Sequence, residues 1–295
     1  MSCRFVRPMV VCILISIAST PVSADRTMAI SFVEQGLRAA DVDAKIRCFT
    51  QAWEADETYA VAAINLATAY QKKGKTDDAV RLFQAALEIA EAAGDAPAAA
   101  QALFGLGDVA YEGRRYGTAW EYYRKGLVHS PGDPETKSRI ATLKKNMPQY
   151  FTSDGEFLFK DRDQIAAGLQ LKRGTGVVPR SDGVDLPIPF EYDSDGISTE
   201  AELQMAALEE AVKTLALGII VINGHCDSRG DPEYNLRLSR RRAESVKRRL
   251  MKATGFPAGR FRTNGFGFER PVVPDARTEA DHQKNRRVEV ALEAK

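Results

Sequence analysis

An acidic and a basic side chain within residues 224–243, GHCDSRGDPEYNLRLSRRRA, have the types and spacing to hold a charged ligand. Asp227 follows an apolar run, and Arg242 lies in the helix predicted after it. Carboxylates accept hydrogen bonds from ammonium groups, and guanidiniums grip carboxylates through two parallel hydrogen bonds. The pair predicts either a structural salt bridge or a site for a zwitterion, and these residues alone leave both interpretations open.

The helix that carries Arg242 is predicted to begin after Asp231 and to run to about Thr254. Asp231 followed by Pro232 is typical of an N-cap and a first helical residue. On a helical projection Arg242 falls within the arc of apolar side chains, and Asn235 falls on the same arc. Because a guanidinium among apolar side chains needs an anion, we expect Arg242 to face a binding site with the Asn235 amide beside it.

The apolar run Leu215–Ile222 is predicted to be a buried strand that continues to residue 226. A strand that feeds a helix through a glycine-containing loop brings its carboxyl end close to the first helical turns. Asp227 and Arg242 are therefore expected at the mouth of one crevice.

Residues 224–243, Asn264-Gly265-Phe266-Gly267 and the late run NRRVEV at 285–290 together resemble the OmpA-like peptidoglycan-binding domain. In that family a GHTD strand end precedes an N-x-x-L-S-x-x-R-A helix, a G-x-G strand and a final N-R-R-V-E strand. The resemblance covers residues 184–295, with its four motif blocks in order.

The resemblance implies that Asp227 and Arg242 hold the zwitterionic end of diaminopimelate in the peptidoglycan stem peptide. Asp193 matches a further acidic position of the family's pocket, and Cys226 stands in the usual threonine position, which removes one hydroxyl. No catalytic residue, metal ligand or cofactor is expected. The candidate ligand residues are Asp227, Arg242, Asn235, Asp193, Cys226 and Arg286.

Residues 1–24 predict a secretory signal peptide. Arginines precede an apolar run at 9–17, and Val22-Ser23-Ala24 is typical of a cleavage site. That run is too short to span a bilayer, and no later apolar run is long enough. We expect a mature chain that starts near Asp25, lies outside the cytoplasm and has no transmembrane segment.

Residues 25–146 contain a helical repeat. Aromatic residues at 49, 83 and 123 occupy equivalent positions in three units, with small residues at 52, 86 and 126. The offset of 34 residues from 49 to 83 resembles the tetratricopeptide repeat. That resemblance implies a solenoid whose concave face holds a partner protein, with a helical spacer as the alternative. The next offset, from 83 to 123, is longer, and its extra residues are expected in a loop at 93–97.

The sequence predicts two domains, as does a length of 295 residues with 44% apolar and 27% charged residues. The first is an all-α, tetratricopeptide-like solenoid at 25–146. The second, at 184–295, is an α/β domain, an α+β sandwich with a mixed four-stranded sheet. Residues 147–183 are expected to be a linker that holds one short helix at 163–171.

Within the second domain, Ser198 or Thr199 followed by Glu202 predicts a capping box. The helices are expected on one face of the sheet. Asn285-Arg286-Arg287 is open to two interpretations, a charged edge strand that guards against aggregation or a lining that meets ligand carboxylates. Strands are predicted at 184–192, 215–226, 260–268 and 286–293, and helices at 198–215 and 232–254.

The function that these patterns predict is a non-enzymatic periplasmic adaptor at the cell wall or outer membrane, binding peptidoglycan through one domain and an envelope protein through the other. A cell-wall hydrolase or precursor-processing enzyme is one alternative, although no paired carboxylates, activated nucleophile or complete metal site has suitable spacing. A module for anionic surfaces is another, based on the arginine-rich helix. The signal peptide argues against a nucleic-acid partner, and the net charge of +1 favours no class of partner.

Overall fold

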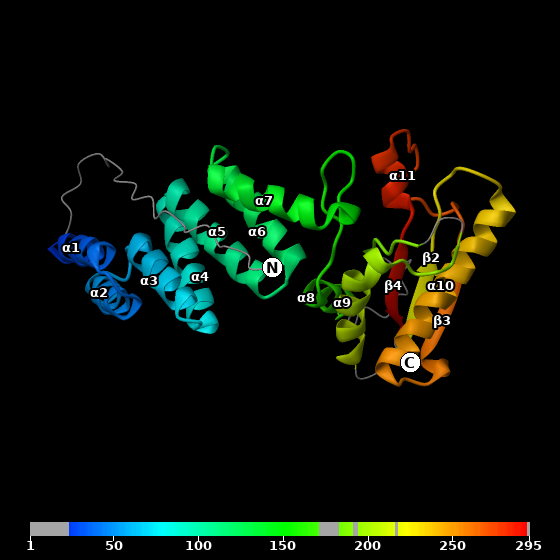
Figure 1. Ribbon diagram of the computed structural model, residues 1–295, viewed down its shortest axis with the longest axis horizontal. Coiled ribbons are helices and arrows are strands. Elements are labelled where there is room, and N and C mark those ends of the chain that lie inside the picture. Colours follow the sequence, from blue (N-terminus) through cyan, green and yellow to red (C-terminus); the bar gives the residue numbers. More distant parts are fainter. Residues whose placement is uncertain (1–23, 171–182, 191–193, 216–217, 294–295) are drawn as a thin grey trace.

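The computed structural model describes residues 24–170, 183–190, 194–215 and 218–293. The molecule is elongated, with an array of helices at one end and a helix-covered sheet at the other (Figure 1). Residues 1–23 of the signal peptide predicted at 1–24 lie outside the described residues, as does Asp193. No helix in the described part of the chain is both long and apolar enough to cross a membrane.

Residues 24–146 form helices and short turns, as the repeat predicts. Helix α1 packs against α2, α3 against α4, and α5 against α6, which gives the stacked helix pairs of a solenoid (Figure 1). The helices are α1 (Ala24–Arg38), α2 (Val42–Ala55), α3 (Ala60–Lys72), α4 (Thr76–Ala93), α5 (Ala96–Glu112), α6 (Tyr116–His129) and α7 (Pro134–Asn146).

Large and small side chains interlock between these helices. Phe49, Phe83 and Tyr123 are buried in equivalent positions, with exposed fractions of 3%, 2% and 1%. Each packs against a small residue: a Cβ atom at Gly107, for example, would lie only 2.4 Å from the Tyr123 ring. The aromatic column predicted from the sequence is therefore the centre of the helical core.

The longer second offset is absorbed by helices rather than by a loop, contrary to the expectation for residues 93–97. Helices α4 and α5 have 18 and 17 residues, against 13 in α3 and 14 in α6. Only Gly94 and Asp95 separate α4 from α5, and Gly94 ends α4 in the left-handed conformation that glycine favours. Pro97 fits in the first turn of α5, where no intrahelical N–H bond is lost.

The second half contains the predicted mixed four-stranded sheet, and the structure gives its strand order as β1-β4-β2-β3. Strand β2 pairs parallel with β3, and β4 pairs antiparallel with both β1 and β2. Its elements are α8 (Arg162–Gln170), β1 (Val184–Leu186), α9 (Glu202–Lys213), β2 (Ile219–Gly224), α10 (Pro232–Thr254), β3 (Phe261–Gly265), α11 (Glu279–Asn285) and β4 (Val288–Glu293), with short 3-10 turns at Pro148–Tyr150, Thr199–Ala201 and Ala258–Arg260.

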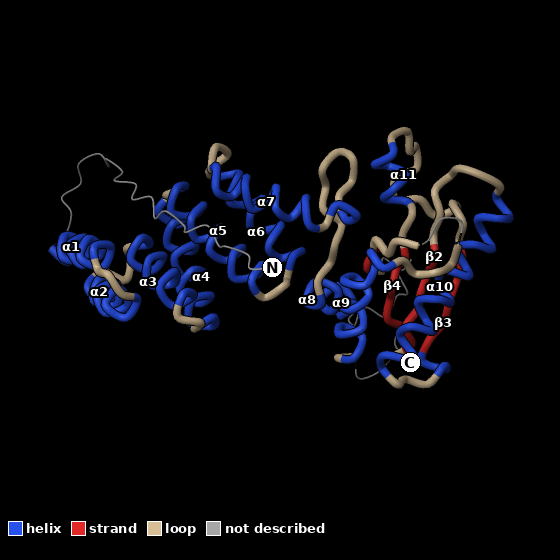
Figure 2. The backbone as a smooth tube through the Cα atoms, viewed as in Figure 1, coloured by secondary structure: helices blue, strands red, loops and turns tan. Residues whose placement is uncertain are grey.

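Helices α8, α9 and α10 cover one face of this sheet (Figure 2). Ile220, Ile222 and Val290 alternate along their strands and are fully buried in a single core with side chains from all three helices. Arg249 of α10 pairs with two glutamates of α9, which holds these helices together. The predicted one-sided covering is confirmed.

All four predicted strands are shorter in the structure: the one predicted at 286–293 begins at Val288, and the other three differ for local reasons. Strand β1 ends at Leu186 because Pro187 lacks the N–H that a sheet needs. Strand β2 begins only at Ile219, after Gly218 with a φ of 108°. Strand β3 ends at Gly265, where α10 crosses close to it. The predicted spans of 184–192, 215–226 and 260–268 were too long.

Two further predictions, of a helix cap and of a sheet edge, were wrong. Ser198 makes no side-chain capping bond, because a 3-10 turn leads into α9. A capping box does form at Thr278 and Asp281, at the start of the unpredicted helix α11. Because β4 lies between β1 and β2, the run Asn285-Arg286-Arg287 precedes an interior strand and cannot guard a sheet edge.

The described part of the predicted linker packs against both halves of the chain. Tyr150 is fully buried, and its hydroxyl donates to the carbonyl of Glu200, 2.6 Å away, in the 3-10 turn before α9. The side chain of Gln204 bonds to both backbone groups of Lys160, at 3.0 and 2.8 Å. The aromatic core of this junction comprises Trp120, Tyr150, Phe151, Phe157 and Phe159.

We expect Phe83→Ala to destabilise the helical half by about 3–5 kcal/mol, because it leaves a cavity in the interlocked core. Denaturant unfolding followed by circular dichroism measures this change. The exposed Lys72→Ala should shift stability by less than about 0.5 kcal/mol. A similarly small effect of Phe83→Ala would contradict the packing described.

Candidate functional site

Close packing of α10 on the sheet places the loop that carries Asp227. A Cβ atom at Gly224, the last residue of β2, would lie 2.0 Å from the carbonyl oxygen of Ser239 in α10. Asp231 caps α10, and its carboxylate accepts from the Tyr234 N–H at 2.7 Å. The predicted helix from Asp231 to Thr254 is confirmed, and the loop at 225–231 is held at its first turn.

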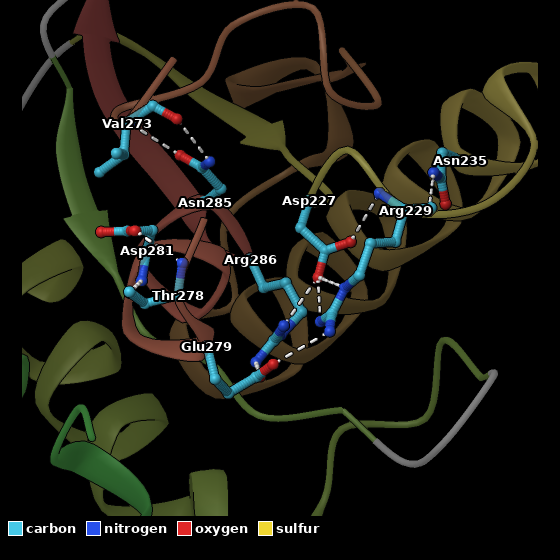
Figure 3. A network of polar contacts seen from close by, with 9 residues as sticks. All are labelled: Asp227, Arg229, Asn235, Val273, Thr278, Glu279, Asp281, Asn285 and Arg286. Carbon is cyan, nitrogen blue, oxygen red and sulfur yellow. Dashed lines mark hydrogen bonds and ion pairs between the residues drawn. The ribbon is translucent and has the colours of Figure 1, made fainter. Parts of the chain in front are cut away.

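Two arginines hold the carboxylate of Asp227, which is 7% exposed (Figure 3). Its Oδ2 accepts from Arg229 Nη2 at 2.6 Å and from Arg286 Nη1 at 2.7 Å, and its Oδ1 accepts from the Arg229 N–H at 3.1 Å. Both guanidiniums also bind Glu279, at 3.0 and 2.6 Å. Two acids and two bases therefore form one closed network.

The network sets the charge state of Asp227. Burial alone would raise the pKa of this carboxyl, but hydrogen bonds from Arg229 and Arg286 outweigh burial and lower the pKa to about 2. The same two arginines lower the pKa of Glu279, Arg286 having the larger effect. Asp227 is a carboxylate at neutral pH.

Asn285 positions Arg286 within this network (Figure 3). Its side-chain oxygen accepts from the N–H groups of Val272 and Val273, both at 2.9 Å, and its amide donates to the Val273 carbonyl at 2.9 Å. The side chain is 2% exposed. It fastens the end of α11 to the preceding loop, so the arginine that follows emerges in a fixed place.

Asn235 and Cys226 pack against each other and stabilise the loop at 225–231. Asn235 is buried, and its amide donates to the carbonyl of Arg229 at 2.7 Å (Figure 3). The Cys226 thiol lies 3.6 Å from the Asn235 carbonyl oxygen, and burial raises the pKa of this thiol. Both residues shape the loop around Asp227, and the Asn235 amide bonds to that loop.

Arg242 is half-buried on the inner side of α10. Its Nε donates to the carbonyl of Ser194 at 3.1 Å, and its guanidinium lies 4.8 Å from the centre of the Phe190 ring. Burial lowers the pKa of this arginine. Among the described residues no acidic side chain forms an ion pair with Arg242, so this guanidinium is well placed to receive an anion.

Arg242 lines a cleft of about 250 Å³. Three guanidiniums line it, so its charge favours an anionic group. Gln149 and Gln283 add carboxamides, and the stretch 187–190 adds an apolar wall. The residues lining the cleft are Gln149, Pro187, Ile188, Pro189, Phe190, His225, Arg242, Gln283, Arg286 and Arg287.

Two other side chains of the cleft, those of Arg287 and His225, lie beside acidic residues. Arg287 Nε binds Asp185 of β1 at 2.5 Å. The buried His225 lies 3.5 Å from Glu289 and stacks on Phe266 with ring centres 5.5 Å apart. Arg286 and Arg287 both pair with acids, whereas Arg242, the third arginine that lines the cleft, has no acidic partner among the described residues.

The sequence of this chain matches known families in both halves. The model of the OmpA family matches residues 189–286, and that of the tetratricopeptide repeat matches residues 58–127. Over 150 residues the chain is 32% identical to the peptidoglycan-associated lipoprotein of Legionella pneumophila, which covers 48% of this chain and 84% of that protein. The chain belongs to the OmpA family.

Two further matches cover a smaller share of the chain. The chain is 35% identical over 111 residues to outer membrane porin F of Pseudomonas fluorescens, which covers 38% of this chain and about a third (33%) of that protein. A solved structure, the cell wall anchor of the T6SS from Pseudomonas aeruginosa, is 29% identical, covers 39% of this chain and 86% of that one, and has a TM-score of 0.33.

The OmpA-like domain brings the predicted residues together in two groups. Arg242 and Arg286 line the cleft, while Asp227 lies behind Arg286 and contacts it directly. Asp227 pairs with Arg229 and Arg286 rather than with Arg242. The structural salt bridge between Asp227 and Arg242, which the sequence left open, therefore does not form.

Four contributors to the site were missing from the sequence prediction. The acid at 279 and the glutamine at 283 belong to the helix that was overlooked, and its capping pattern at 278–281 was the available signal. Arg229 lies within the motif at 224–243, two residues after Asp227. Gln149 carried no signal, because its place in the cleft depends on packing between distant segments.

The pKa of Asp227 predicts how stability depends on pH. Its folded pKa of about 2 is below the ordinary 3.8, so Asp227 stabilises the folded state above the ordinary value and loses that effect as pH falls toward 2. We expect Asp227→Asn to be less stable than wild type at pH 7, and this gap to narrow between about pH 4 and 2. Thermal unfolding of both proteins across this range measures the gap.

The exposed Asp275→Asn is the matched control, and its gap from wild type should stay small at every pH. A gap for Asp227→Asn that stayed constant down to pH 2 would show that the two arginines do not stabilise the ionised carboxylate.

Proposed function

We propose that this chain is a non-enzymatic adaptor of the cell envelope, whose OmpA-like domain binds peptidoglycan and whose helical repeats bind a protein partner. The observation that carries the proposal is the half-buried Arg242, which lines a cationic cleft without a described acidic partner. The ligand proposed for the cleft is the zwitterionic end of diaminopimelate in the stem peptide.

The charges of the site suit the two ends of such a ligand. A carboxylate in the cleft would take two parallel hydrogen bonds from Arg242, with Arg286 close by. The ammonium would approach Asp227, whose Oδ2 accepts three arginine N–H groups and whose Oδ1 accepts only the Arg229 backbone N–H. Because an ionised carboxylate has about four lone-pair sites, Oδ1 has capacity for one more donor.

The proposed affinity is modest. Hydrogen bonds to charged groups contribute about 1.5–3 kcal/mol each, and the loss of translational and rotational freedom opposes them. One site is therefore expected to bind in the high micromolar to millimolar range. Attachment to the wall would gain strength from the repeated ligand in the polymer and from a second contact through the partner protein.

The names of two relatives support the location. One is a peptidoglycan-associated lipoprotein, and another is an outer membrane porin. With the export signal expected at residues 1–24, they support a place in the periplasm, at the cell wall or outer membrane.

We expect Arg242→Ala to abolish co-sedimentation of the full chain with purified sacculi, because it removes the carboxylate-binding group. The neighbouring Arg241→Ala is the matched control: Arg241 lies on the exposed side of α10 and does not line the cleft, so binding should persist. Retention of full binding by Arg242→Ala, in protein with wild-type thermal stability, would refute the site.

A muropeptide-release assay with the same proteins addresses the enzymatic alternative. Release of soluble fragments by the wild type would replace the adaptor with a hydrolase. Salt-dependent binding to anionic vesicles, equal in Arg242→Ala and wild type, would instead indicate a surface-binding module.

The repeats are proposed to bind a protein of the envelope because stacked helix pairs form an extended concave surface. Immobilised full chain should capture such a protein from envelope extracts in which lysozyme has digested the wall. Capture should survive Arg242→Ala, since it does not pass through peptidoglycan. If Arg242→Ala loses the captured protein, or if nothing is captured, the repeats serve as a spacer.

A further inference from the structure

We infer that Gln149, which lies outside the OmpA-like domain, contacts the bound ligand and forms a hydrogen bond with a neutral amide next to the charged head group. This inference rests on the proposed function. Gln149 lines the cleft together with Arg242 and Arg286, yet it precedes the family match at 189–286 by forty positions. The binding site is in this view composite, with one wall built by the segment that follows the helical repeats.

The position of Gln149 is fixed by its neighbours in the chain. It lies in the 3-10 turn Pro148–Tyr150, between an exposed proline and the fully buried Tyr150. The Tyr150 hydroxyl and the Gln149 amide both donate to the carbonyl of Glu200, at 2.6 and 3.4 Å. The turn at 148–150 is thereby attached to the 3-10 turn that precedes α9, and the glutamine side chain cannot move away without losing this contact.

The other side of the same segment is attached to α11. Gln283 donates from its amide to the carbonyl of Phe151 at 3.2 Å, and Lys284 pairs with Glu156 at 2.8 Å. Gln283 also lines the cleft. Two carboxamides, one from each side of the boundary between the halves, are therefore held at the edge of the site.

The chemistry of this wall differs from that of the rest of the cleft. A carboxamide is neutral and offers both N–H donors and an accepting oxygen. Such a group pairs well with an amide or peptide bond and has no preference for a charged group. A ligand that fits the whole cleft would thus carry an amide beside its charged end, as a stem peptide does and a free amino acid does not.

The test compares two soluble probes, free diaminopimelate and a muropeptide that contains it, by calorimetry with the full chain. Gln149→Ala should bind free diaminopimelate as wild type does and should bind the muropeptide about three- to tenfold more weakly, the effect of one neutral hydrogen bond. The exposed Lys145→Ala, from the end of α7, is the control and should match wild type with both probes. Unfolding midpoints confirm that both variants fold.

Each outcome has a distinct meaning. Equal binding of both probes by Gln149→Ala and wild type would overturn the contact, as would an equal loss with both probes, since that would place the glutamine at the charged end. Arg242→Ala should lose both probes. If Arg242→Ala binds them as wild type does, the proposed function fails, whatever the result for Gln149.

Discussion

The site depends on the partial burial of the Arg242 guanidinium, which forms no ion pair with an acidic side chain in the described part of the chain. Arg242 is held by the Phe190 ring and by the Ser194 carbonyl, and burial already disfavours its charged form. Burying an unpaired charge costs free energy, and such groups occur most often at functional sites, where the charge serves to bind a ligand. Asp227, the acid that the sequence suggested as a partner of Arg242, is instead bound by two other arginines, so the attraction of Arg242 for an anion is retained for a ligand.

The fold supplies this arrangement through close contacts rather than through a flexible loop. The glycine at the end of β2 lets α10 approach the sheet, and the amide of Asn235 fixes the loop that carries Asp227 and Arg229. On the opposite side, Asn285 fixes the end of α11 and hence Arg286. Preorganisation of this kind reduces the entropy lost on binding, which matters for a site with few contacts.

Local patterns allowed much of the fold to be predicted from the sequence. The helix from Asp231, the aromatic column of the repeats and the mixed sheet each follow from periodicity or from residues that are close in the chain. Strand order does not, because it depends on which distant segments pair, and that is why Arg286 and Arg287 were assigned to a possible edge. The contacts of Arg229 and Gln149 likewise join residues whose proximity only the folded chain determines.

The junction after the repeats gives the two halves a shared boundary. Tyr150 is buried between them, and Lys284 and Gln283 of α11 bond to the same segment. In a chain with an independent linker, the cleft and the solenoid would be separate functional units. In this one, the segment that ends the solenoid also lines the cleft.

A crystal structure of the full chain with diaminopimelate tests the central claim most directly. The account predicts a ligand carboxylate within hydrogen-bond distance of the Arg242 guanidinium and an ammonium within the same distance of Asp227 Oδ1. A ligand bound elsewhere, or a cleft that stays empty at saturating concentration while Arg242 keeps only its present contacts, would contradict it.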